Sequence, residues 1–188
     1  MIVTLQGLLL AAGSGSRMGI PKALVVGQDG APWLPHGVTS LLGGGCDGVT
    51  VVLGAAAEDA VTLIPPGPVT TVVASDWADG MSASLRAGLR ALAATDAEAA
   101  VVTLVDLPDV DSDVVQRVVD VGVGPGVLAR ATYGGRPGHP VLLGRDHWVG
   151  VAETATGDAG ARDYLTSHDV VLVECGHLAT GRDVDHPA

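Results

Sequence analysis

The chain has 188 residues, of which 47% are hydrophobic and 16% charged, and its formal net charge is −11. This composition excludes a disordered chain, and the length favours one domain over residues 1–188. No run of 18 apolar residues is free of Gly, Pro or charge, so we expect no membrane-spanning helix. The first apolar run follows no basic segment, so we expect a cytoplasmic protein rather than a secreted one.

The acidic charge also limits the partners. No basic patch is visible, which argues against nucleic acid as the main partner. An anionic substrate must therefore be held by a local group of cations or by a metal. The chain contains nine Arg and a single Lys, Lys22, and it contains no Asn. Cys46 and Cys175 have no metal-ligand spacing and are expected to be small buried hydrophobic residues.

Local patterns predict an alternation of strands and helices. Short apolar runs bounded by Gly or Pro indicate buried strands, and apolar residues three and four apart indicate helices. Ser82 and Ser112 are the expected N-caps of two of these helices. In chain order we expect a strand at 4–10, a Gly-rich loop at 11–22, a helix at 33–45, a strand at 49–54, a short helix at 56–63, a strand at 69–74, a helix at 82–94, a strand at 99–105, a helix at 112–121, strands at 126–133 and 139–144, a helix at 158–167 and a strand at 169–174.

This alternation predicts an α/β fold with a doubly wound, mostly parallel sheet and a small antiparallel element. Ligands of such sheets bind beyond the carboxyl ends of the strands. Three polar segments follow predicted strands: the loop after residue 10, Asp106, and the tail after residue 174. The sequence therefore predicts a ligand site at one edge of the sheet.

The loop LLLAAGSGSRMGIPK, residues 8–22, has the chemistry of a phosphate site. Small residues let a ligand approach backbone N–H groups, and Arg17 and Lys22 supply cations. Two other interpretations compete. A dinucleotide site would need a helix directly after the glycines, where Pro21 stands, and an acidic residue after the second strand, which is absent. A purely structural glycine loop is the third possibility.

Six segments in order resemble nucleotidyltransferases, and the form with two alanines and Pro-Lys is similar to the molybdenum cofactor cytidylyltransferases. Besides LAAGSGSRMGIPK, the matching segments are DGMSASLRAGL at 79–89, VTLVDLPDV at 102–110, GRPGHPVLL at 135–143, GDAGARDYL at 157–165 and DVDHP at 183–187. The resemblance covers nearly the whole chain and implies a Rossmann-like nucleotidyltransferase fold.

The resemblance implies roles for the residues of the loop and the strand ends. Arg17 and Lys22 would contact the triphosphate of the nucleotide and, with Asp106, form the catalytic set. Asp106 and Asp185 would bind Mg²⁺, with Asp183 as the other candidate in the tail. The two-alanine loop implies CTP as the nucleotide, whose base would lie against Leu10, Ala11, Ala12 and Gly13.

Further segments are expected to complete the site. The helix start at Gly80, with the hydroxyls of Ser82 and Ser84, would bind an anion of the nucleotide. The acceptor would contact a tight turn and a later helix, through Arg136, Gly138, His139 and Asp158. Asp158 and Arg162 lie four residues apart and could instead form an ion pair on a helix. Trp77 is expected in the core or at a rim.

The expected function is Mg²⁺-dependent transfer of CMP from CTP to a molybdopterin-type cofactor, with release of pyrophosphate. The alternatives are a nucleotidyltransferase for another phosphorylated small molecule, such as a sugar, polyol or phosphonate, and a non-catalytic cofactor carrier that serves a molybdoenzyme. Intact Arg17, Lys22 and Asp106 favour an enzyme, because a carrier could lose them.

Overall fold

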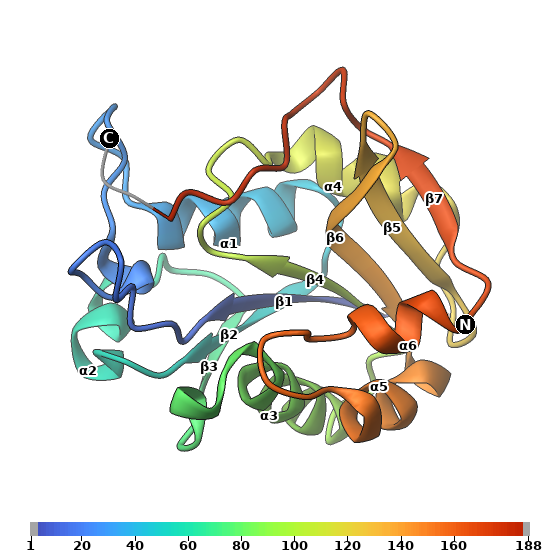
Figure 1. Ribbon diagram of the computed structural model, residues 1–188, viewed down its shortest axis with the longest axis horizontal. Coiled ribbons are helices and arrows are strands. Elements are labelled where there is room, and N and C mark those ends of the chain that lie inside the picture. The colour runs from blue at the N-terminus through green and yellow to red at the C-terminus, as the bar shows by residue number, and fades with distance from the viewer. Residues whose placement is uncertain (1–3, 186–188) are drawn as a thin grey trace.

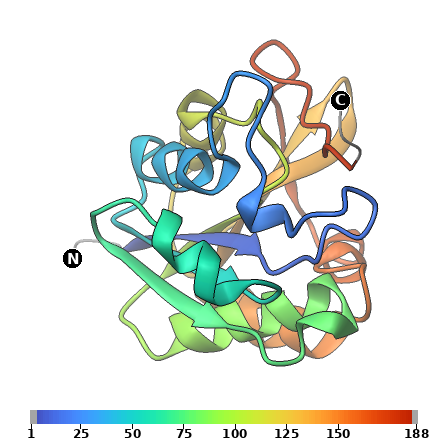
Figure 2. The same ribbon diagram turned by 90° about the vertical axis from the view of Figure 1, so that its left-hand side faces the viewer.

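The computed structural model describes residues 4–185, and it shows one seven-stranded sheet with helices on both faces (Figures 1 and 2). The last two matched residues of the predicted tail segment, 186–187, lie outside the described residues. The strands are β1 (Leu5–Ala11), β2 (Gly48–Leu53), β3 (Val69–Val73), β4 (Ala99–Leu104), β5 (Leu128–Tyr133), β6 (Arg136–Gly144) and β7 (Val171–Glu174). The helices are α1 (Trp33–Gly43), α2 (Ala57–Ala60), α3 (Met81–Ala93), α4 (Ser112–Val119), α5 (Trp148–Thr154) and α6 (Arg162–Thr166).

The sheet has the order β3-β2-β1-β4-β6-β5-β7. Six strands run in one direction, and β6 alone is antiparallel to its neighbours β4 and β5. The antiparallel element arises because the tight turn at Gly134 and Gly135, both with positive φ, folds β6 back onto β5. The predicted fold class, a mostly parallel doubly wound sheet with an antiparallel element, is confirmed.

Two apolar cores explain why the central strands are continuous hydrophobic runs. One core lies between the sheet and α1 and α4, and the other between the sheet and α3, α5 and α6. In β1, Leu9 faces the first core and Leu8 the second, and both side chains are fully buried. A strand covered on both faces needs apolar residues at every position rather than at alternate ones.

The structure corrects several local predictions. Helix α3 begins at Met81 with Gly80 as its N-cap, and α4 has Asp111 as its N-cap, so neither Ser82 nor Ser112 holds that place. The Asp111 carboxylate accepts hydrogen bonds from the N–H groups of Asp113 and Val114. Helix α6 begins only at residue 162, and the sequence interpretation missed α5 entirely. In α5 only Trp148 and Val151 are buried, and two apolar residues are too few to predict a helix from the sequence.

The topology determines where a ligand can bind. From β1 the chain adds β2 and β3 on one side and then crosses to β4 on the other. Beyond the carboxyl ends of β1 and β4 the connections diverge, and this divergence leaves a crevice. No helix of the described residues is long and apolar enough to cross a membrane.

Candidate active site

The glycine loop after β1 folds back on itself and carries Lys22 over the end of the sheet. Gly15 has a φ of +59°, and a Cβ there would lie 1.9 Å from the carbonyl oxygen of Ile20, so only glycine fits. Farther along, the N–H of Lys22 donates to the carbonyl of Gly13 at 3.1 Å. The loop backbone thereby places the one lysine of the chain beside the strand from which the loop starts.

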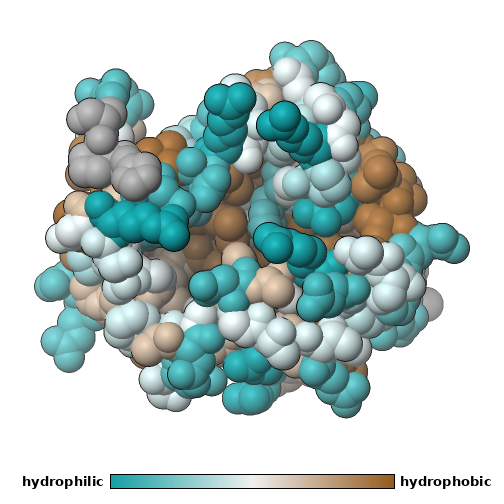
Figure 3. Space-filling view, viewed as in Figure 1, coloured by the Kyte–Doolittle hydropathy of each residue, from teal (hydrophilic) through white to brown (hydrophobic). Residues whose placement is uncertain are grey.

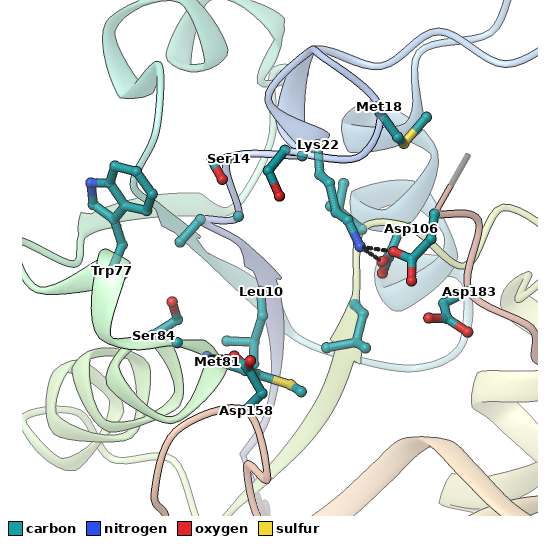
Figure 4. Close-up of a pocket in the computed structure, with 18 of the residues that line it drawn as sticks. Leu10, Ser14, Met18, Lys22, Trp77, Met81, Ser84, Asp106, Asp158 and Asp183 are labelled. Atoms are coloured by element: carbon teal, nitrogen blue, oxygen red, sulfur yellow. Dashed lines mark hydrogen bonds and ion pairs between the residues drawn. The ribbon is translucent and has the colours of Figure 1, made fainter. Parts of the chain in front are cut away.

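Lys22 forms the centre of a small ionic network (Figure 4). Its ammonium contacts the carboxylate of Asp106 and lies 2.7 Å from Oδ1 of Asp185. The Arg17 guanidinium donates to the other oxygen of Asp185 at 2.9 Å. Among residues 4–185 these are the only three ion pairs, although the chain carries 21 acidic and ten basic residues. The ion pairs of the described residues thus all lie at the crevice.

The network shifts the protonation of its members. Partial burial disfavours the charged form of Lys22, but hydrogen bonds to Asp106 and Asp185 outweigh it and raise the pKa of the lysine above its ordinary value. The hydrogen bond from Lys22 is also the main cause that lowers the pKa of Asp185. Lys22 and Asp185 are therefore both charged at neutral pH.

The C-terminal tail reaches the site because Asp109 and the backbone of Asp106 anchor it. The N–H of Thr180 donates to Oδ2 of Asp109 at 2.7 Å, and the N–H of Val184 donates to the Asp106 carbonyl at 3.0 Å. These bonds bring Asp185 to Lys22 across 163 positions of sequence.

Three carboxylates at this corner have the arrangement of a cation site. Oxygens of Asp106, Asp183 and Asp185 lie within 4.8 Å of one another. Carboxylate oxygen is the ligand that Mg²⁺ and Mn²⁺ prefer, and two or three carboxylates with substrate phosphates suffice for such an ion. The three carboxylates therefore fit a hard divalent cation. In the described structure the ammonium of Lys22 is the counter-charge of two of them, Asp106 and Asp185.

A cavity of about 590 Å³ extends from this corner along the crevice. Figure 3 shows the molecule hollowed near the centre of this face, with apolar surface on one wall and hydrophilic side chains at the rim. In Figure 4 the acidic corner with Asp106 and Asp183 lies on one side and Trp77 on the opposite side. Trp77 fits there because Gly54 has no side chain: a Cβ at Gly54 would lie 2.6 Å from the indole.

Another wall of the cavity is the start of α3, where the carboxylate of Asp158 contacts the first turn of the helix. Its Oδ1 accepts a hydrogen bond from the N–H of Met81 at 3.2 Å. A Cβ at Gly80 would lie 2.6 Å from this oxygen, so the absence of a side chain at Gly80 leaves room for the carboxylate. Ser82 is fully buried, and its hydroxyl accepts from the N–H of Gly160 rather than facing the cavity.

The structure brings most of the predicted site residues together. The cavity lining includes Leu10, Ala12, Gly13, Arg17, Lys22, Gly80, Ser84, Asp106, Asp158 and Asp185. Trp77 and Met81, which were not predicted to be part of the site, also line the cavity. Asp183, the other metal-ligand candidate in the tail, lines it too. An aromatic residue just before the Gly-Met-Ser helix start was the available signal for Trp77, but only its packing on Gly54 shows where the ring points.

Other predicted residues lie elsewhere. Ala11 is buried at the end of β1, and Ser82 is buried in α3. Arg136, Gly138 and His139 belong to strand β6 rather than to a turn, and they are not part of the cavity lining. Asp158 precedes α6 and forms no ion pair with Arg162, so the predicted helical pair is absent from the described residues.

Comparisons with known proteins agree with this geometry. The family model described as "MobA-like NTP transferase domain" matches residues 7–171. A curated relative, nicotine blue oxidoreductase from Paenarthrobacter nicotinovorans, is 37% identical over 189 aligned residues, which cover 95% of this chain and 91% of the relative.

Solved structures share the fold. Rv0371c from Mycobacterium tuberculosis H37Rv superposes with a TM-score of 0.78 at 28% identity, covering 99% of this chain and 95% of that one. The same protein has been solved in complex with manganese, with a TM-score of 0.77, 26% identity and coverage of 97% and 94%. A nucleotidyl transferase from Methanothermobacter thermautotroptrophicus has a TM-score of 0.76 at 21% identity, covers 97% and 92%, and shares the fold.

Proposed function

Because this chain belongs to the MobA-like NTP transferase domain family, we propose that it transfers CMP from CTP to a molybdopterin-type cofactor with release of pyrophosphate. The observation that carries the proposal is the convergence of Lys22, Arg17 and the three-carboxylate corner beside a glycine loop, all inside one cavity. A triphosphate needs such cations, and its metal needs such carboxylates.

The transfer requires positioning and charge neutralisation more than covalent chemistry by the protein. A phosphate oxygen of the acceptor attacks the α-phosphorus of CTP. The new oxygen–phosphorus bond forms as the bond to the β-phosphate oxygen breaks, and pyrophosphate leaves with that electron pair. Lys22 and Arg17 would stabilise the negative charge on the leaving group.

Asp106, Asp183 and Asp185 would hold Mg²⁺ against the phosphates, as the fold family implies. When bound, the ion would supply Lewis-acid withdrawal of charge from the phosphate oxygens. Asp106 is the rigid member of this set, because only Val105 separates it from β4 and only 5% of it is exposed. Asp185 depends on the tail, which the backbone carbonyl of Asp106 holds in place.

The loop residues support the choice of CTP. Ala12 lines the cavity and is 3% exposed, and its carbonyl accepts a hydrogen bond from Ala55 at 3.1 Å. In this proposal the Ala12 methyl would narrow the space beside the loop backbone and so favour the single ring of a pyrimidine.

The test is a pyrophosphate-release assay with each of the four nucleoside triphosphates, Mg²⁺ or Mn²⁺, and molybdopterin as acceptor. We expect turnover with CTP above GTP, and none without the divalent cation. Turnover only with a sugar, polyol or phosphonate acceptor would move the assignment to another nucleotidyltransferase. Tight cofactor binding without pyrophosphate release would indicate a non-catalytic carrier for a molybdoenzyme.

The relative at 37% identity favours a second candidate, an oxidoreductase. The same cavity would then hold a reduced nicotinamide dinucleotide through Arg17 and Lys22, and not through the helix start and the acidic residue of a dinucleotide fingerprint, which the chain lacks. When bound, such a cofactor would supply hydride to the acceptor, with the proton taken from water. Acceptor-dependent loss of NADH or NADPH absorbance in a metal-free assay, with no pyrophosphate release from any triphosphate, would establish this candidate instead.

A further inference from the structure

The C-terminal tail, residues 175–185, crosses the end of the sheet before it reaches the acidic corner. Figure 1 shows it leaving β7, passing the β5–β6 hairpin and running toward the loop that follows β1. It carries Asp183 and Asp185 to the carboxylate of Asp106. Because these two tail residues belong to no helix or strand, their positions depend on the contacts that hold the tail to the rest of the molecule.

One of these contacts joins the backbone of Gly181 to the aromatic ring of Tyr133, the last residue of β5. Gly181 has a φ of +60°, and a Cβ at this position would overlap three carbon atoms of the ring, Cε2, Cδ2 and Cζ. The tail backbone therefore lies directly against the ring, closer than a residue with a side chain could approach.

The Tyr133 ring is itself held in place. Its hydroxyl donates to the carbonyl of His139 at 2.6 Å, and the ring packs against the first core. Gly138 lies against the same edge of the ring, where a Cβ would be 2.8 Å from Cε2. Burial raises the pKa of Tyr133, so the hydroxyl keeps its proton at neutral pH and continues to donate. The tail therefore meets a ring that is fixed at its hydroxyl and along its edge.

The contact at Gly181 lies close to the carboxylates along the chain. Gly181 is followed by Asp183 after two residues and by Asp185 after four. Two residues of chain span at most about 7 Å, so few bonds can absorb a displacement. The next anchor is the N–H of Val184, which donates to the Asp106 carbonyl at 3.0 Å. Asp183 is exposed and lies between these two anchors, so its position follows from them.

We propose that Tyr133 is a positioning residue for the divalent cation: its ring sets the path of the tail at Gly181 and so places the carboxylates of Asp183 and Asp185 beside Asp106. The proposal rests on the proposed function in one respect, that the three-carboxylate corner binds this cation. Tyr133 is not one of the described residues that line the cavity, so it acts through the tail. The affinity for metal then depends on the backbone path of the tail as well as on the carboxylates themselves.

The test is calorimetric titration of Mn²⁺ into the full chain, without nucleotide or acceptor. Gly181→Ala should push the tail off the ring and weaken Mn²⁺ binding about 10–100-fold, the loss typical of residues that orient metal ligands. Gly30→Ala is the matched control, because Gly30 also has a positive φ, +80°, but no atom lies within 4 Å of a Cβ placed there. It imposes a similar backbone strain without the overlap and should leave the Mn²⁺ affinity unchanged.

Variants of Tyr133 test whether the ring is the cause. Tyr133→Phe keeps the ring and should bind Mn²⁺ nearly as well as wild type, whereas Tyr133→Leu should bind it more weakly. In the Tyr133→Leu background, Gly181→Ala should cost less Mn²⁺ affinity than it costs in wild type, because the overlapping ring carbons are gone. Such non-additivity is expected of residues in contact. A merely structural role of Tyr133 would lower the Tm and leave the effects of the two replacements additive.

Binding of CTP without metal serves as the check on folding. It depends on Lys22 and Arg17 and should not be weakened in Gly181→Ala, so a loss confined to Mn²⁺ supports the proposal. Unchanged Mn²⁺ affinity in Gly181→Ala, an equal loss in Gly30→Ala, or additive losses in the double variant would each overturn it. A failure of pyrophosphate release with every triphosphate would count against the proposed function alone, because Mn²⁺ binding is measured without substrates.

Discussion

Replacement of Lys22 by Met should weaken nucleotide binding and at the same time strengthen metal binding to the free protein. The ammonium contacts Asp106 and Asp185, which are two of the three carboxylates that would hold the cation. A metal ion that binds the free protein must therefore displace Lys22 from these oxygens. Once displaced, the lysine is free to contact the phosphates of the nucleotide.

The magnitudes follow from the burial of the network. The exposed fractions of the side chains are 22% for Lys22, 7% for Asp106 and 27% for Asp185, so water screens these pairs only partly. At an effective dielectric constant of about 20, opposite charges about 4 Å apart attract by about 4 kcal/mol. Most of this is offset by desolvation of the lysine, and we expect Lys22→Met to bind Mn²⁺ about tenfold more tightly. Loss of the phosphate contact should cost about 1.5–3 kcal/mol, or about 10–150-fold in affinity for CTP.

The assay is calorimetric titration of Mn²⁺ and of CTP into wild type and variant, with thermal unfolding as a second measurement. Without metal, Lys22→Met should have a lower Tm than wild type, because the two carboxylates then repel each other. Saturating Mn²⁺ should raise the Tm of the variant more than that of wild type. Arg17→Met is the control, because the Arg17 side chain is 69% exposed and contacts Asp185 alone, so its effect on Mn²⁺ should be smaller. Weaker Mn²⁺ binding by Lys22→Met, or an unchanged affinity for CTP, would refute the reasoning.

Asp106→Asn should abolish pyrophosphate release while the Tm stays within a few degrees of wild type, because a strand-end carboxylate contributes little core packing; full activity, or activity in excess chelator, would contradict the metal role. Ala12→Gly should raise turnover with GTP relative to CTP by widening the loop, and an unchanged ratio would show that another residue selects the base. Thr180→Val removes one of the two hydrogen bonds to Asp109, so the Mn²⁺ concentration for half-maximal binding should rise several-fold, whereas Thr180→Ser should restore it. The backbone N–H of Gly134 is the main cause that lowers the pKa of Glu174 to about 2. Because the pKa is depressed on folding, the Glu174 carboxylate stabilises the fold fully above pH 4.5, its ordinary pKa, and that stability is lost as the pH falls toward 2. Glu174→Gln should therefore lower the Tm at neutral pH. If the Tm difference between the variant and wild type were just as large near pH 2, the charge of Glu174 would not be its cause.

Local sequence patterns were sufficient for most of the elements and for the glycine loop. The continuous apolar run of β4 and the stripe of Leu85 and Leu89 in α3 are short-range features. They predict a strand and a helix without knowledge of the rest of the chain. Asp106 could be recognised because a carboxylate directly after a buried strand lies at the edge where ligands bind. The Gly15 turn is likewise local, since the steric conflict with Ile20 lies within the loop itself.

The tertiary structure alone decided which of these side chains meet. The N–H of Met81 at the start of α3 donates to a carboxylate 77 positions away, that of Asp158, so no pattern near Ser82 could reveal this contact. Lys22 and Asp185 are 163 positions apart and meet because the strand order and the hydrogen bond from Val184 to Asp106 bring the tail to β4. In the sequence Arg130 is an ordinary strand residue, and only the tertiary structure shows that its Nε is buried without a hydrogen-bond partner among residues 4–185. Sequence periodicity reports contacts over a few residues, whereas a site at a sheet edge is assembled by strand order and packing, which act over the whole chain.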